Sequence, residues 1–196
     1  MCFIEVNITE YVKYECNKEN VILNLVDNNH ILVNNIMCKG YFSHEPTPEI
    51  TVAVNSVDYE ITLLHEFCHY LQFKNNSIMY DMMITSNSES LVDDWLAGIE
   101  IENIEAHIDI LLAVEMECEH LAIDLATRNN LKLDTDTYCK KANSYLLFYK
   151  LLKKTRKWYN TPPYEIAEVW KSMPPKIEEL ELEKHPSIKL VYSSFG

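Results

Sequence analysis

The stretch ITLLHEFCHYLQF, residues 61–73, constrains the fold of this chain more than any other. Its apolar residues recur at helical spacing and are expected to face the core: Leu64, Phe67, Cys68 and Leu71. His65 and His69 are four residues apart, so a helix places them one above the other on the same side. The stretch therefore predicts a helix over about residues 58–75 with two imidazoles on one face.

The histidine pair predicts a metal site. Two imidazole nitrogens on one helix face can converge on a zinc ion about 2.0–2.1 Å from each of them. Glu66 lies beside the pair, where a carboxylate can take a proton from zinc-bound water and pass it to a leaving amine. Chance gives roughly 0.03 occurrences of His-Glu-x-x-His in a chain of this composition. The alternative is a helix whose two histidines bind no metal.

A catalytic zinc site needs a third protein ligand and leaves one position for water. The stretch AVEMECEHLAIDLA, residues 113–126, crowds carboxylates into an apolar helical pattern, where burial requires a partner or a cation. Relative to an apolar stripe centred on Cys118, Glu115 lies nearest the core face and Glu119 follows on the same flank. We expect Glu115 to be the ligand and Glu119 to hydrogen-bond a ligating histidine. The exchanged assignment stays open, as does the possibility that all these glutamates are solvated.

The remaining histidines have no partner at ligand spacing and are expected to be structural or solvated: His30, His44, His107, His120 and His185. A three-histidine site of the metzincin kind requires His-Glu-x-x-His-x-x-Gly-x-x-His. Residues 72–75 read QFKN, so that class is excluded.

Together, the two stretches resemble the gluzincin-like zinc metallopeptidases, in which a His-Glu-x-x-His helix precedes a second helix that carries a glutamate ligand. Several of those families have Glu-x-x-Ala-Asp-x-x-Ala in the second helix, where this chain has Glu115-x-x-Cys118-Glu119-x-x-Ala122. HEFCHYLQF with a later E-x-x-C-E also looks like small metallopeptidases encoded by phages and bacteria. The resemblance covers about residues 50–126.

The resemblance implies a zincin-like α+β fold, Zn²⁺ as cofactor and peptide-bond hydrolysis. It implies His65, His69 and Glu115 as metal ligands and Glu66 as general base and acid, with Glu119 as a hydrogen-bond partner or alternative ligand.

Two further expectations come from the same resemblance. Such folds often place an edge strand before the metal helix, to which a peptide substrate adds as another strand. ITVAV, residues 50–54, is in that place, although an ordinary interior strand is equally open. Similar peptidases use a tyrosine or histidine to stabilise the developing oxyanion. KANSYLLFY offers Tyr145 and Tyr149, for which a core or surface role is the alternative.

The chain as a whole is predicted to form a single metallopeptidase-like domain, residues 1–196, in three parts. Residues 1–57 form a β-rich N-terminal part, in which VILNLV (21–26) and HILVNNIM (30–37) pair as a hairpin. Residues 58–129 carry the metal-site helices, and residues 130–196 form a C-terminal helical part.

Besides the metal helix, the sequence predicts the following helical segments: residues 91–99, residues 103–129, a helix from Asp134 or Asp136 to about Trp158, residues 164–172, and a solvated helical face at 178–184.

The composition argues against nucleic acids and membranes as binding partners. A net charge of −13 and a pI near 4.9 argue against nucleic-acid binding, and we interpret the basic stretch KLLKKTRKW (150–158) as a solvated helix face. No apolar run approaches the roughly 20 residues that span a bilayer, which predicts no membrane association. The six cysteines form no Cys-x-x-Cys pair and follow no signal peptide, so we expect reduced thiols in a cytoplasm, the host's if a phage encodes the chain.

We therefore predict a zinc-dependent metallopeptidase that acts on a protein or peptide. The rival is a non-enzymatic protein on a zincin scaffold, such as a virion-associated binding factor. Glu66 favours the enzyme, because a structural zinc is usually closed by a fourth ligand and has little use for a base. A peptidase that cleaves one repressor combines both. The sequence indicates no oligomeric state.

Overall fold

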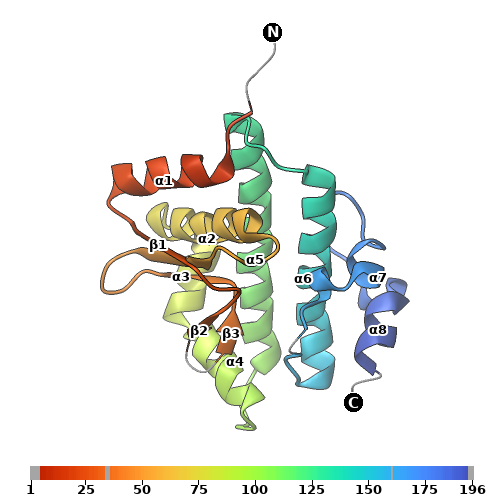
Figure 1. Cartoon of the computed structure of the whole chain (residues 1–196). Coiled ribbons are helices and arrows are strands. Elements are labelled where there is room, and N and C mark those ends of the chain that lie inside the picture. Colours follow the sequence, from red (N-terminus) through yellow and green to blue (C-terminus); the bar gives the residue numbers. More distant parts are fainter. Residues whose placement is uncertain (1–4, 34–35, 160, 194–196) are drawn as a thin grey trace. The chain divides into compact units, whose positions relative to one another are not determined.

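The computed structural model describes residues 5–33, 36–159 and 161–193 and has an α+β fold (Figure 1). Contacts divide the chain into two units. Unit 1 comprises Met1–Ser77 and His120–Leu133, and unit 2 comprises Ile78–Glu119 and Asp134–Gly196. Among the described residues, no helix combines the length and the apolar character needed to cross a membrane.

Unit 1 contains a three-stranded sheet of order β1-β5-β4, formed by β1 (Ile22–Val26), β5 (Glu49–Ala53) and β4 (Gly40–Ser43). Strand β5 runs parallel to β1 and antiparallel to β4. The predicted hairpin between residues 21–26 and 30–37 is therefore wrong, because β1 pairs with a strand much later in the chain.

The residues of the predicted second strand instead form a hairpin of their own, β2 (Ile31–Val33) with β3 (Ile36–Cys38). The intervening residues 34–35 lie outside the described part of the chain. Short local pairing thus replaces the longer hairpin.

Strand β5 holds the middle of the sheet, so ITVAV is an interior strand and its expected role as an edge strand is wrong. Its β-branched residues Ile50 and Val52 are fully buried. The edges are β1 and β4, and helix α2 (Tyr59–Lys74) packs against β4 and β5. The helix matches the predicted residues 58–75 closely.

The N-terminal part also contains a helix that the sequence analysis did not predict, α1 (Ile8–Glu19). Asn7 caps it by accepting a hydrogen bond from the Glu10 backbone N–H at 3.0 Å. The Asn7 amide also donates to Glu60 of α2 at 2.7 Å. Helices α1 and α2 lie side by side (Figure 1), with Tyr11 against the edge of Phe67.

Unit 1 is completed by a segment from far along the chain. Val6 forms a parallel bridge with Leu131, through hydrogen bonds from Val6 N–H to Asn130 O and from Lys132 N–H to Val6 O. Both segments belong to unit 1.

Unit 2 is helical. Its elements are α3 (Ile78–Thr85), α4 (Ser88–Leu96), most of α5 (Ile104–Asn129), α6 (Thr135–Thr155), η1 (Pro163–Glu165), α7 (Ala167–Trp170), η2 (Leu182–Lys184) and α8 (Pro186–Ser193). The predictions for 103–129 and for a helix capped by Asp134 are confirmed, although α6 ends at Thr155. Residues 164–172 contain only a 3₁₀ turn and the short α7, and the expected helical face at 178–184 contains only the turn η2.

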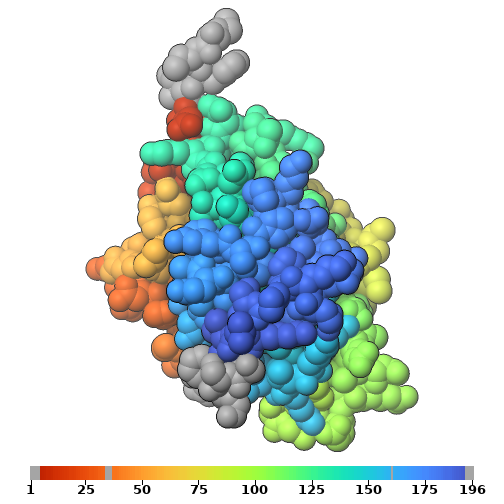
Figure 2. Space-filling view, turned by 90° about the vertical axis from the view of Figure 1, so that its right-hand side faces the viewer, coloured from red at the N-terminus to blue at the C-terminus, as the bar shows by residue number. Residues whose placement is uncertain are grey.

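The core of unit 2 forms around α6. Leu147, Phe148 and Leu151 pack with residues of α7 and α8, and Figure 2 shows these blue C-terminal segments covering α6. On another side, Leu146 and Leu152 pack with residues of α4 and α5.

The basic stretch at the end of α6 is paired with carboxylates of the same unit. The pairs are Lys150–Glu179, Lys153–Asp109, Lys154–Glu183 and Arg156–Glu100. Its positive charge is therefore largely compensated locally.

Candidate metal centre

Helix α2 brings the two motif histidines together. The Nε2 atoms of His65 and His69 are 3.1 Å apart, and the ring centroids are 4.6 Å apart with the planes at 90°. Both side chains are half-buried, whereas their neighbours Leu64 and Cys68 are fully buried. The helical spacing thus does what the sequence predicts, aiming two imidazole nitrogens at one point.

The separation of the nitrogens fits a shared metal ion. Two nitrogens that each lie about 2.05 Å from a tetrahedral zinc are about 3.3 Å apart. The observed 3.1 Å is within a few tenths of an ångström of that value. Neutral imidazole is also a ligand that zinc prefers, so the pair fits the ion in geometry and in chemistry.

Gln72 orients one of the two rings, a role that the sequence analysis did not assign. Its Oε1 accepts a hydrogen bond from Nδ1 of His69 at 2.8 Å, and Gln72 is only 2% exposed. Because a carboxamide oxygen only accepts, the proton of His69 is held on Nδ1 and Nε2 keeps its lone pair. The sequence feature that could have indicated this role is a polar residue three positions after the second histidine, on the same helix face.

Glu66 is buried against the edge strand β4. It is 8% exposed, and a Cβ added at Gly40 would lie 3.1 Å from its Cγ and 3.3 Å from its Oε1. Burial, and then the nearby Glu66 charge, raise the pKa of the Cys38 thiol. The glycine at the start of β4 therefore leaves room for the Glu66 side chain, and Cys38 lies close enough to sense its charge.

The candidate third ligands lie on α5 in unit 2. Glu119 and Cys118 are buried, Glu115 is half-buried, and Glu117 is exposed. The alternative that all these glutamates are solvated is therefore wrong. His120 is exposed, as expected.

Cys118 adds a third candidate to Glu115 and Glu119. Thiolates are good zinc ligands, but the sequence analysis assigned Cys118 only to the apolar stripe. The histidines belong to unit 1, whereas Glu115, Cys118 and Glu119 belong to unit 2.

Glu115 is held by a tyrosine that the sequence analysis considered for oxyanion stabilisation. The Tyr149 hydroxyl donates to Glu115 Oε1 at 3.3 Å, and the hydroxyls of Tyr145 and Tyr149 are 3.2 Å apart. Burial, and then the Glu115 charge, raise the pKa of both tyrosines well above the ordinary value. Both phenols therefore stay protonated and can act as hydrogen-bond donors.

Histidines outside α2 have contacts of a structural kind. His107 Nδ1 is 3.0 Å from the buried Ser88 hydroxyl at the start of α4. The ring of His44 packs on Phe73, with the centroids 5.3 Å apart. These contacts agree with the expectation that these two histidines are structural.

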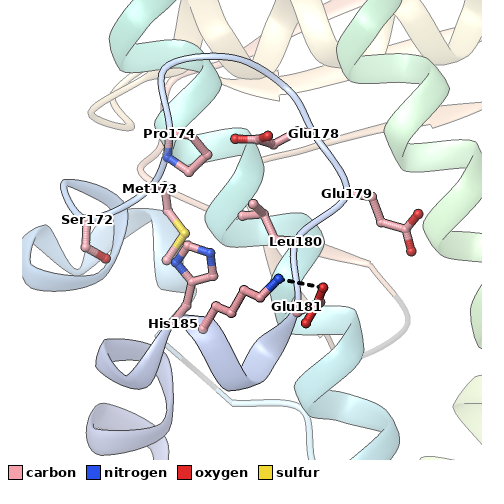
Figure 3. A pocket seen from close by; sticks show the side chains of 9 residues that line it. Ser172, Met173, Pro174, Glu178, Glu179, Leu180, Glu181 and His185 are labelled. Carbon is pink, nitrogen blue, oxygen red and sulfur yellow. Dashed lines mark hydrogen bonds and ion pairs between the residues drawn. The ribbon is translucent and has the colours of Figure 1, made fainter.

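A pocket of about 440 Å³ lies in unit 2, in the region where a helical face was expected (Figure 3). Met173 and Leu180 supply apolar lining, Glu178 supplies a carboxylate, and Lys184 is paired with Glu181 at 2.8 Å. His185 also lines the pocket. None of the proposed zinc ligands lines this pocket.

No protein-family model, curated protein or solved structure matches this chain. Its function is therefore inferred from the chemistry of its own side chains.

Proposed function

We propose that this protein is a zinc-dependent peptide hydrolase. The observation that carries the proposal is the 3.1 Å separation of the His65 and His69 Nε2 atoms, with Gln72 holding the proton of His69 on the opposite nitrogen. With its proton on Nδ1, His69 keeps the Nε2 lone pair that a metal ion shared with His65 would need. The glutamate between them adds the group that hydrolysis requires.

Each residue has a distinct part in the proposed reaction. Bound zinc would lower the pKa of a water molecule and polarise the scissile carbonyl. Glu66 takes the proton of the attacking water and delivers it to the leaving amine. Its burial against β4 limits the directions in which the carboxylate can move. Gln72 keeps His69 in the tautomer that presents Nε2 to the ion.

The third ligand is proposed to come from α5, where Glu115, Cys118 and Glu119 are the candidates. Glu115 remains our first choice because its register matches the glutamate helix of gluzincin-like peptidases. Cys118 is the alternative, because a thiolate is a good zinc ligand, and Glu119 would then be a buried hydrogen-bond partner.

Tyr145 and Tyr149 are proposed as donors that keep their protons at neutral pH. Tyr149 donates to Glu115, so its direct role is to orient a candidate ligand. Stabilising the oxyanion of a protein or peptide substrate is the other role that a protonated phenol could serve.

The decisive experiment measures zinc content by mass spectrometry in the wild type and in Glu66→Gln, Glu115→Gln, Cys118→Ser and Glu119→Gln, with Glu105→Gln as control. Glu105 is an exposed glutamate of the same helix, so it matches the chemistry without the burial. We expect one of the three candidates to lose stoichiometric zinc, while Glu66→Gln and the control retain it.

The same proteins are then incubated with a broad peptide library. Wild type should cleave, and Glu66→Gln should be slower by roughly 10²–10⁴-fold, the usual contribution of a general base. Absence of stoichiometric zinc in the wild type would refute the proposal. Zinc without cleavage in the library would indicate the non-enzymatic scaffold instead.

A further inference from the structure

Helix α3 exposes apolar side chains that a surface helix normally hides. Only Tyr80 is buried in this eight-residue helix, whose sequence is IMYDMMIT. Ile78 is 72% exposed, and Met82 and Ile84 are each 43% exposed. A surface helix usually keeps its apolar residues on the core side, and clustered exposed apolar groups mark interaction sites.

The exposed face of α3 is suited to contact with another helix. Ile78 and Met82 are four residues apart, so they lie one above the other on the same side. Met79, Met82 and Met83 are three of the seven methionines of the chain. Methionine is unbranched and polarizable, so it adapts to varied partner surfaces.

Exposed carboxylates lie on α3 and on α4. Residues 75–127 contain twelve aspartates and glutamates and no lysine or arginine, in a chain whose net charge is −13. Asp81 is exposed on α3, and Asp93 and Asp94 are exposed on α4, which contacts α3 (Figure 1). Helices α3 and α4 therefore carry exposed carboxylates together with exposed apolar side chains, and neither helix contains a lysine or arginine.

We propose that α3 and α4 form a docking surface for a cationic amphipathic helix of another protein. An apolar stripe on the partner would cover Ile78 and Met82, and flanking lysines or arginines would face Asp81, Asp93 and Asp94. A second copy of this chain is disfavoured, because an isologous contact would bring these carboxylates against one another. The inference does not depend on the zinc site.

The test uses a fluorescein-labelled peptide of leucine and lysine at helical spacing, with a leucine and glutamate peptide of the same length as comparison. Fluorescence anisotropy reports binding to the full-length protein. We expect saturable binding of the lysine peptide only, weakened by added salt because the charges are exposed.

Neutral substitutions separate the docking surface from general attraction to an acidic protein. Ile78→Ser/Met82→Ser should weaken binding by about tenfold or more, because it removes apolar contacts without changing charge. Leu190→Ser is the matched control, an equally exposed leucine on helix α8, and should leave affinity within about twofold. Met82→Gln, a single change on an exposed face, supplies a second variant should the double variant be unstable.

Asp93→Lys/Asp94→Lys should also weaken binding of the lysine peptide and make that binding less dependent on salt. Equal affinity of the lysine peptide for wild type and for Ile78→Ser/Met82→Ser would overturn the proposal. The peptide would then bind only through the net charge of the protein. Binding of the glutamate peptide, or a concentration-dependent dimer that the α3 variants abolish in sedimentation velocity, would overturn it as well.

Discussion

At the scale of single residues, Gln72 determines which nitrogen of His69 is available to a metal. Gln72→Leu removes the acceptor that holds the Nδ1 proton, at a distance of 2.8 Å between Nδ1 and Oε1. Loss of such a partner typically lowers metal affinity by about 10–100-fold. We expect that loss in a zinc competition titration with a chromophoric chelator.

Gln72→Glu is the matched control for the same titration, since a carboxylate also accepts the Nδ1 proton and should largely preserve affinity. If Gln72→Leu and wild type have the same zinc affinity, Gln72 has only a packing role.

Replacing Gly40 tests the position of the Glu66 side chain separately from zinc binding. In Gly40→Ala the new Cβ would lie 2.7 Å from Thr62 Cγ2 and 3.1 Å from Glu66 Cγ, so side chains of α2 must move. Displacing a catalytic group by as little as 1 Å can cost about 10²-fold in rate. We expect a lower kcat with unchanged zinc content, measured on a peptide that the wild type cleaves.

Gly98→Ala is the control for Gly40→Ala, because it should change stability but not catalysis. Nothing lies within 4 Å of a Cβ at Gly98, but its φ of +103° strains any other residue. This variant should lower Tm and leave kcat unchanged. An equal loss of kcat in the Gly40 and Gly98 variants would show that general destabilisation, rather than displacement of Glu66, causes the loss.

At the scale of elements, α6 begins at a carboxylate that responds to pH. Hydrogen bonds from the side chain and backbone N–H of Thr137 lower the pKa of Asp134. A lowered folded-state pKa means that the stabilisation is present above the unfolded-state pKa and is lost as pH falls through the folded-state value. Asp134→Ala should therefore lower Tm at pH 7 and have a smaller effect near pH 3, in paired thermal melts. A constant difference in Tm across this range would contradict the charged cap.

Helix α6 also holds the following loop through one buried amide. Asn143 is fully buried and donates to the carbonyls of Pro174 and Lys176 at 3.0 and 2.6 Å, and its Oδ1 accepts from Glu178 N–H. Asn143→Leu leaves these backbone groups without their partner, which typically costs about 1–3 kcal/mol. Urea denaturation should show a lower midpoint. An unchanged midpoint would mean that water replaces the amide.

The elements also show what a sequence can predict. Helices α2, α5 and α6 followed from apolar spacing and from a capping residue such as Asp134, which are local signals. Helix α1 was missed although Ile8, Val12 and Cys16 recur every four residues, because charged and polar residues separate them. The pairing of β1 with β5 depends on residues 27 positions apart, as in Ile22 and Glu49, and no local pattern encodes it.

In the candidate site too, some residues could be predicted from local sequence and others could not. His65, Glu66 and His69 were predicted from one helical turn of sequence, whereas the role of Gln72 depends on where a side chain points. The choice among Glu115, Cys118 and Glu119 depends on tertiary contacts, so spacing along α5 alone could not decide it.

At the scale of the whole molecule, the zinc proposal predicts that the metal stabilises the fold. A ligand that binds only the folded state adds about 2.7 kcal/mol when its concentration is 100 times its Kd. Treatment with a chelator should lower Tm, and added zinc should restore it. His65→Ala/His69→Ala should melt at the same temperature with and without chelator. A chelator effect of equal size in this variant would place the responsive metal elsewhere.

The bridge between Val6 and Leu131 has a consequence for the order in which the protein can fold during synthesis. A ribosome that has released residues 1–77 has supplied the sheet and α2, but not the backbone groups at Asn130 and Lys132 that hold Val6. All of unit 2's first segment, Ile78–Glu119, must emerge before these groups do. Contacts so distant in sequence are slow to close, so unit 1 is expected to reach its final form late in translation.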